Sequence, residues 1–118
     1  MAIATIASWT VPDGHVAVVT TVHQALESPQ AYRDCTFLLW YRGQECEYWK
    51  PEKAEVTPTC IVLFEEETIE LRVLNEGLLR HYCDAEITGY YYRQHPVGKN
   101  QIGASPHIGL NARGENDV

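Results

Sequence analysis

Short runs of β-branched and aromatic residues, separated by turn-forming residues, follow one another along most of this chain. The clearest run is TIELRVL (68–74), in which Ile69, Leu71 and Val73 alternate with the charged Glu70 and Arg72. An alternation with a period of two is typical of a β-strand that buries one of its faces. Long helical periodicity is not evident in the sequence. The pattern therefore predicts an all-β protein.

Seven to eight strands are expected before residue 95. We place them near residues 2–11, 16–23, 35–41, 46–50, 60–64, 68–74 and 84–93, with an ambiguous stretch at 78–83. Gly43 is expected in the turn of a hairpin, and the two prolines of PEKAEVTPT (51–59) restrict that segment to a loop or a sheet edge. Turn signals recur about every 8–12 residues, which favours an antiparallel β-sandwich or jelly roll, with a small closed barrel as the main alternative.

The last part of the sequence has a different composition. Residues 95–118 contain four of the eight glycines and only isolated apolar side chains, so this segment cannot bury enough surface to fold alone. We therefore expect a β-sandwich domain over residues 1–94 and an extended C-terminal arm over residues 95–118. The arm is expected to lie on a neighbouring subunit; the alternative is that it folds back over its own domain. Its apolar contacts would be Val97, Ile102, Ile108 and Leu110.

Charge and composition exclude several function classes. The net charge is −7, from 16 acidic and 9 basic residues, and such a surface repels phosphate backbones, so we expect no nucleic-acid binding. The sequence lacks an apolar stretch approaching the ~20 residues of a membrane span, so we expect no membrane partner. The start of the chain reads as a strand and not as a signal peptide. The four cysteines form no C-x-x-C pair and are expected to be buried free thiols, although two disulfides remain an alternative.

Motifs for catalysis are missing from the sequence. It contains no G-x-S-x-G, H-E-x-x-H, P-loop or G-x-G-x-x-G pattern, so we expect no enzyme, no cofactor and no metal. The acidic run Glu65–Glu67 is expected to be a solvated corner. A calcium site is the sharper alternative for this run, because that ion prefers oxygen ligands.

Aromatic residues are the remaining candidates for binding. Trp40 and Trp49 lie on the expected hairpin, and Tyr91 lies on the last strand, where Tyr90 and Tyr92 must point to the opposite face. Exposed Trp and Tyr side chains are common anchors of protein interfaces and also stack on sugars. Trp40, Trp49 and Tyr91 are therefore expected to bind a partner. The competing interpretation is that they fill the core.

Two stretches of the sequence resemble a known group of proteins. VPDGHVAVVTTVH (11–23) is similar to a P-x-G-h-x-A-x-V hairpin entry, and IVLFEEETIELRVLNEG (61–77) followed by AEITGYYY (85–92) is similar to the later half of the same pattern. The pattern resembles capsid decoration (cement) and related auxiliary virion proteins of tailed bacteriophages, over about residues 11–92. The corner Glu65–Glu67 departs from it, because Gly-Asp is more usual there.

The resemblance implies a structural, non-enzymatic role on a virus particle. It implies a capsid decoration protein that assembles in the host cytoplasm, oligomerises as a trimer or another small oligomer, and stabilises the capsid surface of the virion. Its partners would be further copies of itself and a major capsid protein, bridged by the C-terminal arm. The alternative function is a carbohydrate- or receptor-binding β-sandwich module, as in a tail fibre.

Overall fold

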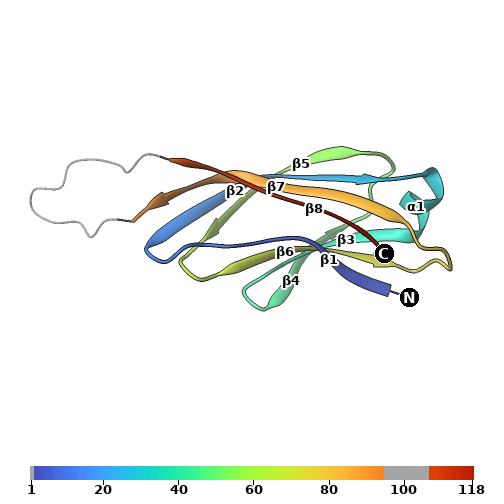
Figure 1. Ribbon diagram of the computed structural model, residues 1–118, viewed down its shortest axis with the longest axis horizontal. Helices are drawn as coiled ribbons and strands as arrows, with labels where there is room; N and C mark the ends of the chain where they lie inside the picture. Colours follow the sequence, from blue (N-terminus) through green and yellow to red (C-terminus); the bar gives the residue numbers. More distant parts are fainter. Residues whose placement is uncertain (1, 95–106) are drawn as a thin grey trace, which may run out of the picture.

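The computed structural model describes residues 2–94 and 107–118 of the chain as two antiparallel sheets that face each other (Figure 1). Sheet A contains, in order across the sheet, β1 (Ala2–Thr10), β6 (Thr68–Asn75), β3 (Cys35–Tyr41) and β4 (Gln44–Trp49). Sheet B contains β5 (Glu55–Leu63), β2 (His15–Leu26), β7 (Tyr82–Arg93) and β8 (Ile108–Asp117). One short helix, α1 (Pro29–Asp34), connects β2 to β3. The expected all-β sandwich is confirmed.

The core lies between the two sheets and follows from the alternation in the sequence. Ile69, Leu71 and Val73 of β6 are buried as expected, and they pack in the same cluster as Phe37 of β3 and Ile87 of β7. Each such side chain contributes about 1.5–3 kcal/mol when it is fully buried. The residues between these buried side chains on the same strands point away from the core, so each sheet has an outer face that no other layer of the described residues covers.

One side of the sandwich is closed by a close approach between β1 and β8. A Cβ atom on Gly114 of β8 would lie 1.7 Å from the carbonyl oxygen of Ile6, so only glycine allows this contact. The register of β1 against β6 shifts between Thr5 and Ala7, at the same place. On the other side, β4 and β5 form the remaining edges, and β5 carries Pro58, a residue that sheets tolerate at an edge.

Consecutive connections alternate between the two ends of the sandwich (Figure 1). The helix end carries α1 and the β4–β5 and β6–β7 connections, whereas the turn end carries the β1–β2, β3–β4 and β5–β6 turns. At the turn end, Arg42 and Gly43 both have positive φ, of 54° and 73°, which is the two-residue turn that matches strand twist in a hairpin. The two ends therefore point in opposite directions.

The structure corrects the expected arm over most of its second half. Residues 108–117 form β8, which pairs with β7 from Ile108 opposite Tyr91 to Asp117 opposite Tyr82. Leu110 is only 3% exposed and belongs to the core, so it is not a contact for a neighbouring subunit. The segment can form a strand despite its few apolar residues, because the backbone of β7 provides hydrogen-bond partners along its length. As the edge strand of sheet B, β8 adds only a few side chains to the core. Val97 and Ile102 lie outside the described residues.

The cysteines only partly follow expectation. All four are free, and Cys35 and Cys83 are buried in the core, but Cys46 is half-buried and Cys60 is exposed. Desolvation raises the pKa of the Cys35 thiol to about 11, and it raises the pKa of the Cys83 thiol to about 12. Both thiols therefore stay protonated and act as small apolar core residues.

Candidate partner-binding surfaces

The outer face of sheet A carries a second apolar cluster, separate from the core. Leu38 points away from the core, yet it is only 8% exposed, because it pairs with Tyr48 of β4 on one side and Arg72 of β6 on the other. Trp40 is the next outward residue along β3 and is half-buried. We call this set the sheet A face: Ile3, Leu38, Trp40, Tyr48, Arg72 and Leu74.

Arg72 is the charged centre of the sheet A face. Its guanidinium carbon lies 4.0 Å from the centroid of the Trp40 ring, and its Nη2 forms an ion pair with Glu70. The indole Nε1 of Trp40 is buried and has no hydrogen-bond partner among the described residues. An unpaired buried donor costs about 1–3 kcal/mol. Arg72 therefore covers the Trp40 ring, while the unpaired indole N–H of Trp40 lowers the stability of the fold.

The rim of the sheet A face is open to solvent. Tyr48 is 73% exposed, and Ile3, at the opposite margin on β1, is 55% exposed. Beside Trp40 lies a shallow cavity of about 370 Å³, whose lining combines aromatic, hydroxyl and charged side chains: Trp40, Tyr41, Gly43, Thr68, Glu70 and Arg72. Aromatic and arginine side chains around a desolvated centre are the composition of protein interfaces.

Two of the sequence-predicted binding residues lie on the inner faces instead. Trp49 stacks on Phe37 with ring centroids 6.1 Å apart and packs against the core. Tyr91 packs against the core as well, 5.2 Å from the ring of Trp9. Both side chains are half-buried against the core, so neither is a fully exposed anchor, and their part in partner binding stays a prediction. The strand alternation allowed either face, and the sequence did not decide between them.

The neighbours of Tyr91 occupy the outer face of sheet B. Tyr90 stacks on His107 with ring centroids 4.7 Å apart, and Tyr92 lies 5.3 Å from the same imidazole. Ile108 pairs with Tyr91 and therefore lies on the inner side of β8, beyond the closed part of the core, where it is 47% exposed. It stays a candidate for an apolar contact with a neighbour. The sequence predicted Tyr91 as the binding residue of β7, whereas the structure places Tyr90 and Tyr92 on the outer face.

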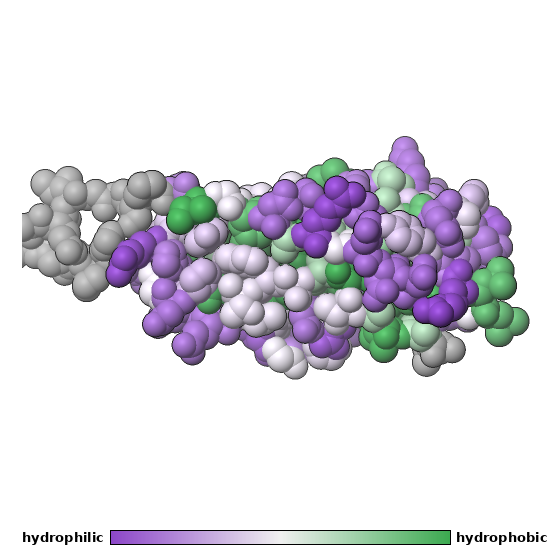
Figure 2. Space-filling model, viewed as in Figure 1, coloured by the Kyte–Doolittle hydropathy of each residue, from purple (hydrophilic) through white to green (hydrophobic). Residues whose placement is uncertain are grey.

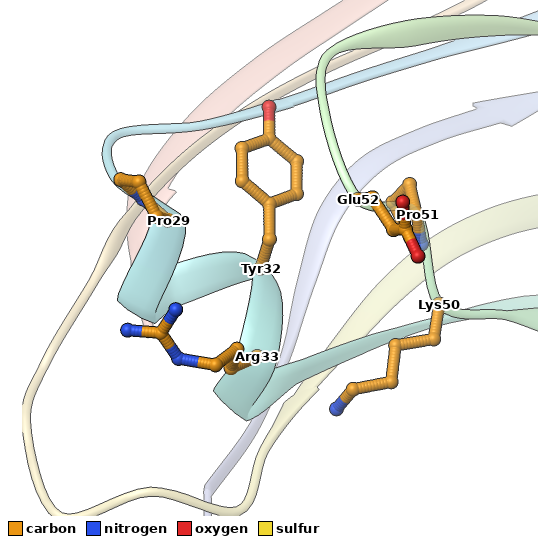
Figure 3. Close-up of a pocket in the computed structure, with 6 residues that line it drawn as sticks. All are labelled: Pro29, Tyr32, Arg33, Lys50, Pro51 and Glu52. Carbon is orange, nitrogen blue, oxygen red and sulfur yellow. The ribbon is translucent and has the colours of Figure 1, made fainter.

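A groove crosses the helix end between α1 and the β4–β5 connection (Figure 3). Pro29, Tyr32 and Arg33 of α1 and the segment Lys50–Glu52 line a space of about 400 Å³. In Figure 3 the Tyr32 ring lies beside Pro51 and Glu52, whereas the Arg33 side chain extends away from them. The Tyr32 hydroxyl turns away from the opening and accepts a hydrogen bond from the Leu26 amide. Arg33 donates to the neutral Gln30 side chain, and neither Arg33 nor Lys50 forms an ion pair with the described residues. We call this the α1 groove.

Two leucines protrude beside this groove. Figure 2 shows apolar side chains at the end of the molecule that carries the β6–β7 connection, where Leu78 is fully exposed and Leu79 is largely exposed. The loop is held at its base, since the Asn75 side-chain amide donates to the carbonyls of Leu79 and Val118. The chain therefore presents these side chains on an anchored backbone.

A buried histidine fastens the helix end together. Nε2 of His81 lies 2.8 Å from Oδ2 of Asp34 on α1, and its Nδ1 lies 3.4 Å from Oε1 of Glu27. The hydrogen bond from His81 is the main cause of a lowered Asp34 pKa. Gly77 packs directly on the Asp34 side chain. This arrangement connects the start of β7 and the leucine loop to α1.

Comparison with known proteins gives no relative from which a function can be transferred. No protein-family model matches the sequence, and no curated protein or solved structure matches it. Within residues 2–94 and 107–118, no helix is long and apolar enough to cross a membrane. In the same part of the chain, no cluster of three or more His, Cys, Asp or Glu side chains is placed to hold a metal ion.

Proposed function

We propose that this protein is a structural, non-enzymatic virion protein, a capsid decoration protein that oligomerises and stabilises the particle by bridging neighbouring capsid subunits. The observation that carries the proposal is the uncovered sheet A face. An apolar face without a covering layer marks an interaction site when it is large and polar residues surround it. Tyr48 and Ile3 form its exposed margins, and Trp40 with Arg72 its half-buried centre.

The energetics of the sheet A face suit docking on a larger partner. Covering an exposed Tyr48 or Ile3 side chain contributes about 1.5–3 kcal/mol each. A face that is already assembled loses little conformational freedom on binding, and Arg72 is held in place by Trp40 and Glu70. An overall net charge of −7 keeps the free subunit soluble until it docks.

Bridging two capsid subunits requires a second contact. The helix end offers one, because Leu78 and Leu79 protrude there on an anchored loop. Val97 and Ile102 of the arm stay as proposed contacts with a neighbour, although they lie outside the described residues. In this proposal the sheet A face binds one capsid subunit and the helix end reaches the next.

The experiment is co-sedimentation of the purified chain with capsids of the phage that encodes it. The Tyr48→Ser variant should bind at least ~30-fold more weakly, the loss expected for an interface anchor worth about 2 kcal/mol. Val56→Ser is the matched control, since Val56 is an exposed apolar residue on β5 of the other sheet. Equal binding by wild type and Tyr48→Ser, or no binding by the wild type, contradicts the proposal.

The cavity beside Trp40 favours a second candidate, a carbohydrate- or receptor-binding module. Its lining places Glu70 and Arg72 next to aromatic rings, as a sugar site requires. However, Arg72 covers one face of the Trp40 ring, so a sugar could stack on that face only after Arg72 moved. A glycan array followed by a tryptophan fluorescence titration separates the two functions. A glycan that binds beside Trp40 and changes the tryptophan emission in the absence of capsids favours the binding module, whereas capsid docking without any glycan binding favours the decoration protein.

A further inference from the structure

The α1 groove is a cationic site on an acidic protein. Arg33 and Lys50 stand on its two walls, against one carboxylate, Glu52, so its lining is net positive, and Lys53 follows in the same connection. Its apolar surface comes from two prolines and the Tyr32 ring. At about 400 Å³, its volume is within the usual range for a binding pocket and accommodates one large side chain. These features fit a segment that carries an aromatic side chain beside carboxylates.

The chain carries such a segment at its other end. Phe64, at the β5–β6 turn, is 51% exposed, and Glu65 and Glu66 follow it. The turn is fixed: the Glu66 amide donates to the Val11 carbonyl over 2.9 Å, and Glu65 Oε2 accepts from the Gly14 amide over 2.8 Å. The Glu66 carboxylate has no partner among the described residues. We call Phe64–Glu66 the acidic tip.

We propose that the acidic tip of one copy docks in the α1 groove of a second copy. Phe64 would lie between Pro29 and Pro51, on the Tyr32 ring, and the Glu66 carboxylate would meet Lys50. The inference rests on the proposed assembly role and names the self-contact within it. Both surfaces keep their shape before contact, so little ordering is needed. Charge reversal on either side should weaken the contact strongly.

The α1 groove and the acidic tip lie at opposite ends of the sandwich (Figure 1). Two copies that lie antiparallel, side by side, would make the contact twice in a closed dimer, whereas copies joined end to end would make it once. The end-to-end arrangement leaves one groove and one tip unused in a dimer, so in that case association continues until a ring closes or a filament grows.

The test is sedimentation equilibrium of the full chain over about 10 µM to 1 mM, at low and high salt. The wild type should self-associate, and less at high salt because the contact is ionic. The Lys50→Glu and Glu66→Lys variants should each associate at least ~10-fold more weakly. Glu47→Lys makes the same charge change as Glu66→Lys, at an exposed position on β4, and should behave like the wild type. Circular dichroism verifies that each variant is folded.

Mixing the two variants gives the distinctive result. In an equimolar mixture of Lys50→Glu and Glu66→Lys, every groove finds a tip of opposite charge, so association should return to near the wild-type level. A monomeric wild type at 1 mM, or variants that associate as the wild type does, overturns the inference. A mixture that stays as weak as its components also overturns it. None of these results affects capsid docking by the sheet A face, which the Tyr48→Ser experiment tests separately.

Discussion

The guanidinium of Arg72 lies over the ring of Trp40, 4.0 Å from its centroid, on the outside of the sandwich. The two residues come from adjacent strands, β6 and β3, and Arg72 also forms an ion pair with Glu70. Together they close the central part of the sheet A face while its margins stay open. This pair is why Trp40, although it points outward, is only half-exposed.

Removing the arginine should weaken the fold modestly. We expect Arg72→Ala to lower the free energy of unfolding by about 1 kcal/mol, since cation–π contacts at partly exposed sites contribute about 0.5–2 kcal/mol. Urea denaturation followed by circular dichroism measures this change. Arg72→Lys, which keeps the charge beside Glu70, should lose less. An Arg72→Ala variant as stable as the wild type would show that the stacking is not energetically significant.

Truncation within β8 should reveal a core strand. Leu110→Ala removes a buried side chain and should lower the free energy of unfolding by about 2–5 kcal/mol. Ile108→Ala, two residues earlier on the same strand and 47% exposed, is the matched control and should cost under ~1 kcal/mol. If the two variants were equally stable, β8 would not belong to the sandwich of the isolated chain.

Acid should selectively weaken the helix end. The folded pKa of Asp34 is lower than the unfolded value of 3.8, chiefly through the hydrogen bond with His81. Its contribution to stability is therefore complete above the unfolded pKa and is lost as the pH falls through the folded pKa. Asp34→Asn should be less stable than the wild type at pH 7 and should lose less further stability between about pH 5 and pH 2.

Urea titrations across this pH range provide the comparison. Asp13→Asn, a change at an exposed carboxyl of the turn end, serves as the control and should follow the wild-type curve. If Asp34→Asn kept the full acid sensitivity of the wild type, the His81–Asp34 pair would not be the source of that sensitivity.

Three of the four thiols should fall into two classes of reactivity. Cys35 and Cys83 are buried, so reagents reach them poorly. Their pKa values are raised to about 11 and 12, so little of either thiol is in the reactive thiolate form at neutral pH. Cys60 is exposed. We expect iodoacetamide at pH 8 to label Cys60 in the folded chain and to label Cys35 and Cys83 only after unfolding, as peptide mass spectrometry would record. Rapid labelling of Cys83 in the folded chain contradicts the described core.

The sequence carries the fold most clearly where one face of a strand is apolar. The alternation over β6 placed Ile69, Leu71 and Val73 in the core, and Pro58 indicated the edge position of β5. The segment of β8 gave no such signal, because its stability comes from hydrogen bonds to β7 and from a single large buried residue, Leu110, within the strand. Partnership with a strand elsewhere in the chain cannot be seen in a local pattern.

Surface residues were harder to assign for a related reason. Alternation shows that Tyr90 and Tyr92 oppose Tyr91, but the choice of the inner face depends on the neighbouring sheet, here on Trp9. Trp40 points to the outer face of sheet A and is half-buried there, and its part in partner binding stays a prediction. The covering of Trp40 by Arg72 depends on the pairing register of β3 with β6, which only the assembled sheet defines. The α1 groove likewise joins two connections that are distant in sequence.

The most direct test of the proposed docking is hydroxyl-radical footprinting of the chain bound to capsids of the phage that is proposed to carry it, compared with the free chain. If the sheet A face is the contact, oxidation of Tyr48 and Ile3 should fall several-fold on binding, while Val56 on the other sheet keeps its rate. Bound chain in which Tyr48 reacts as fast as in the free chain would contradict the account.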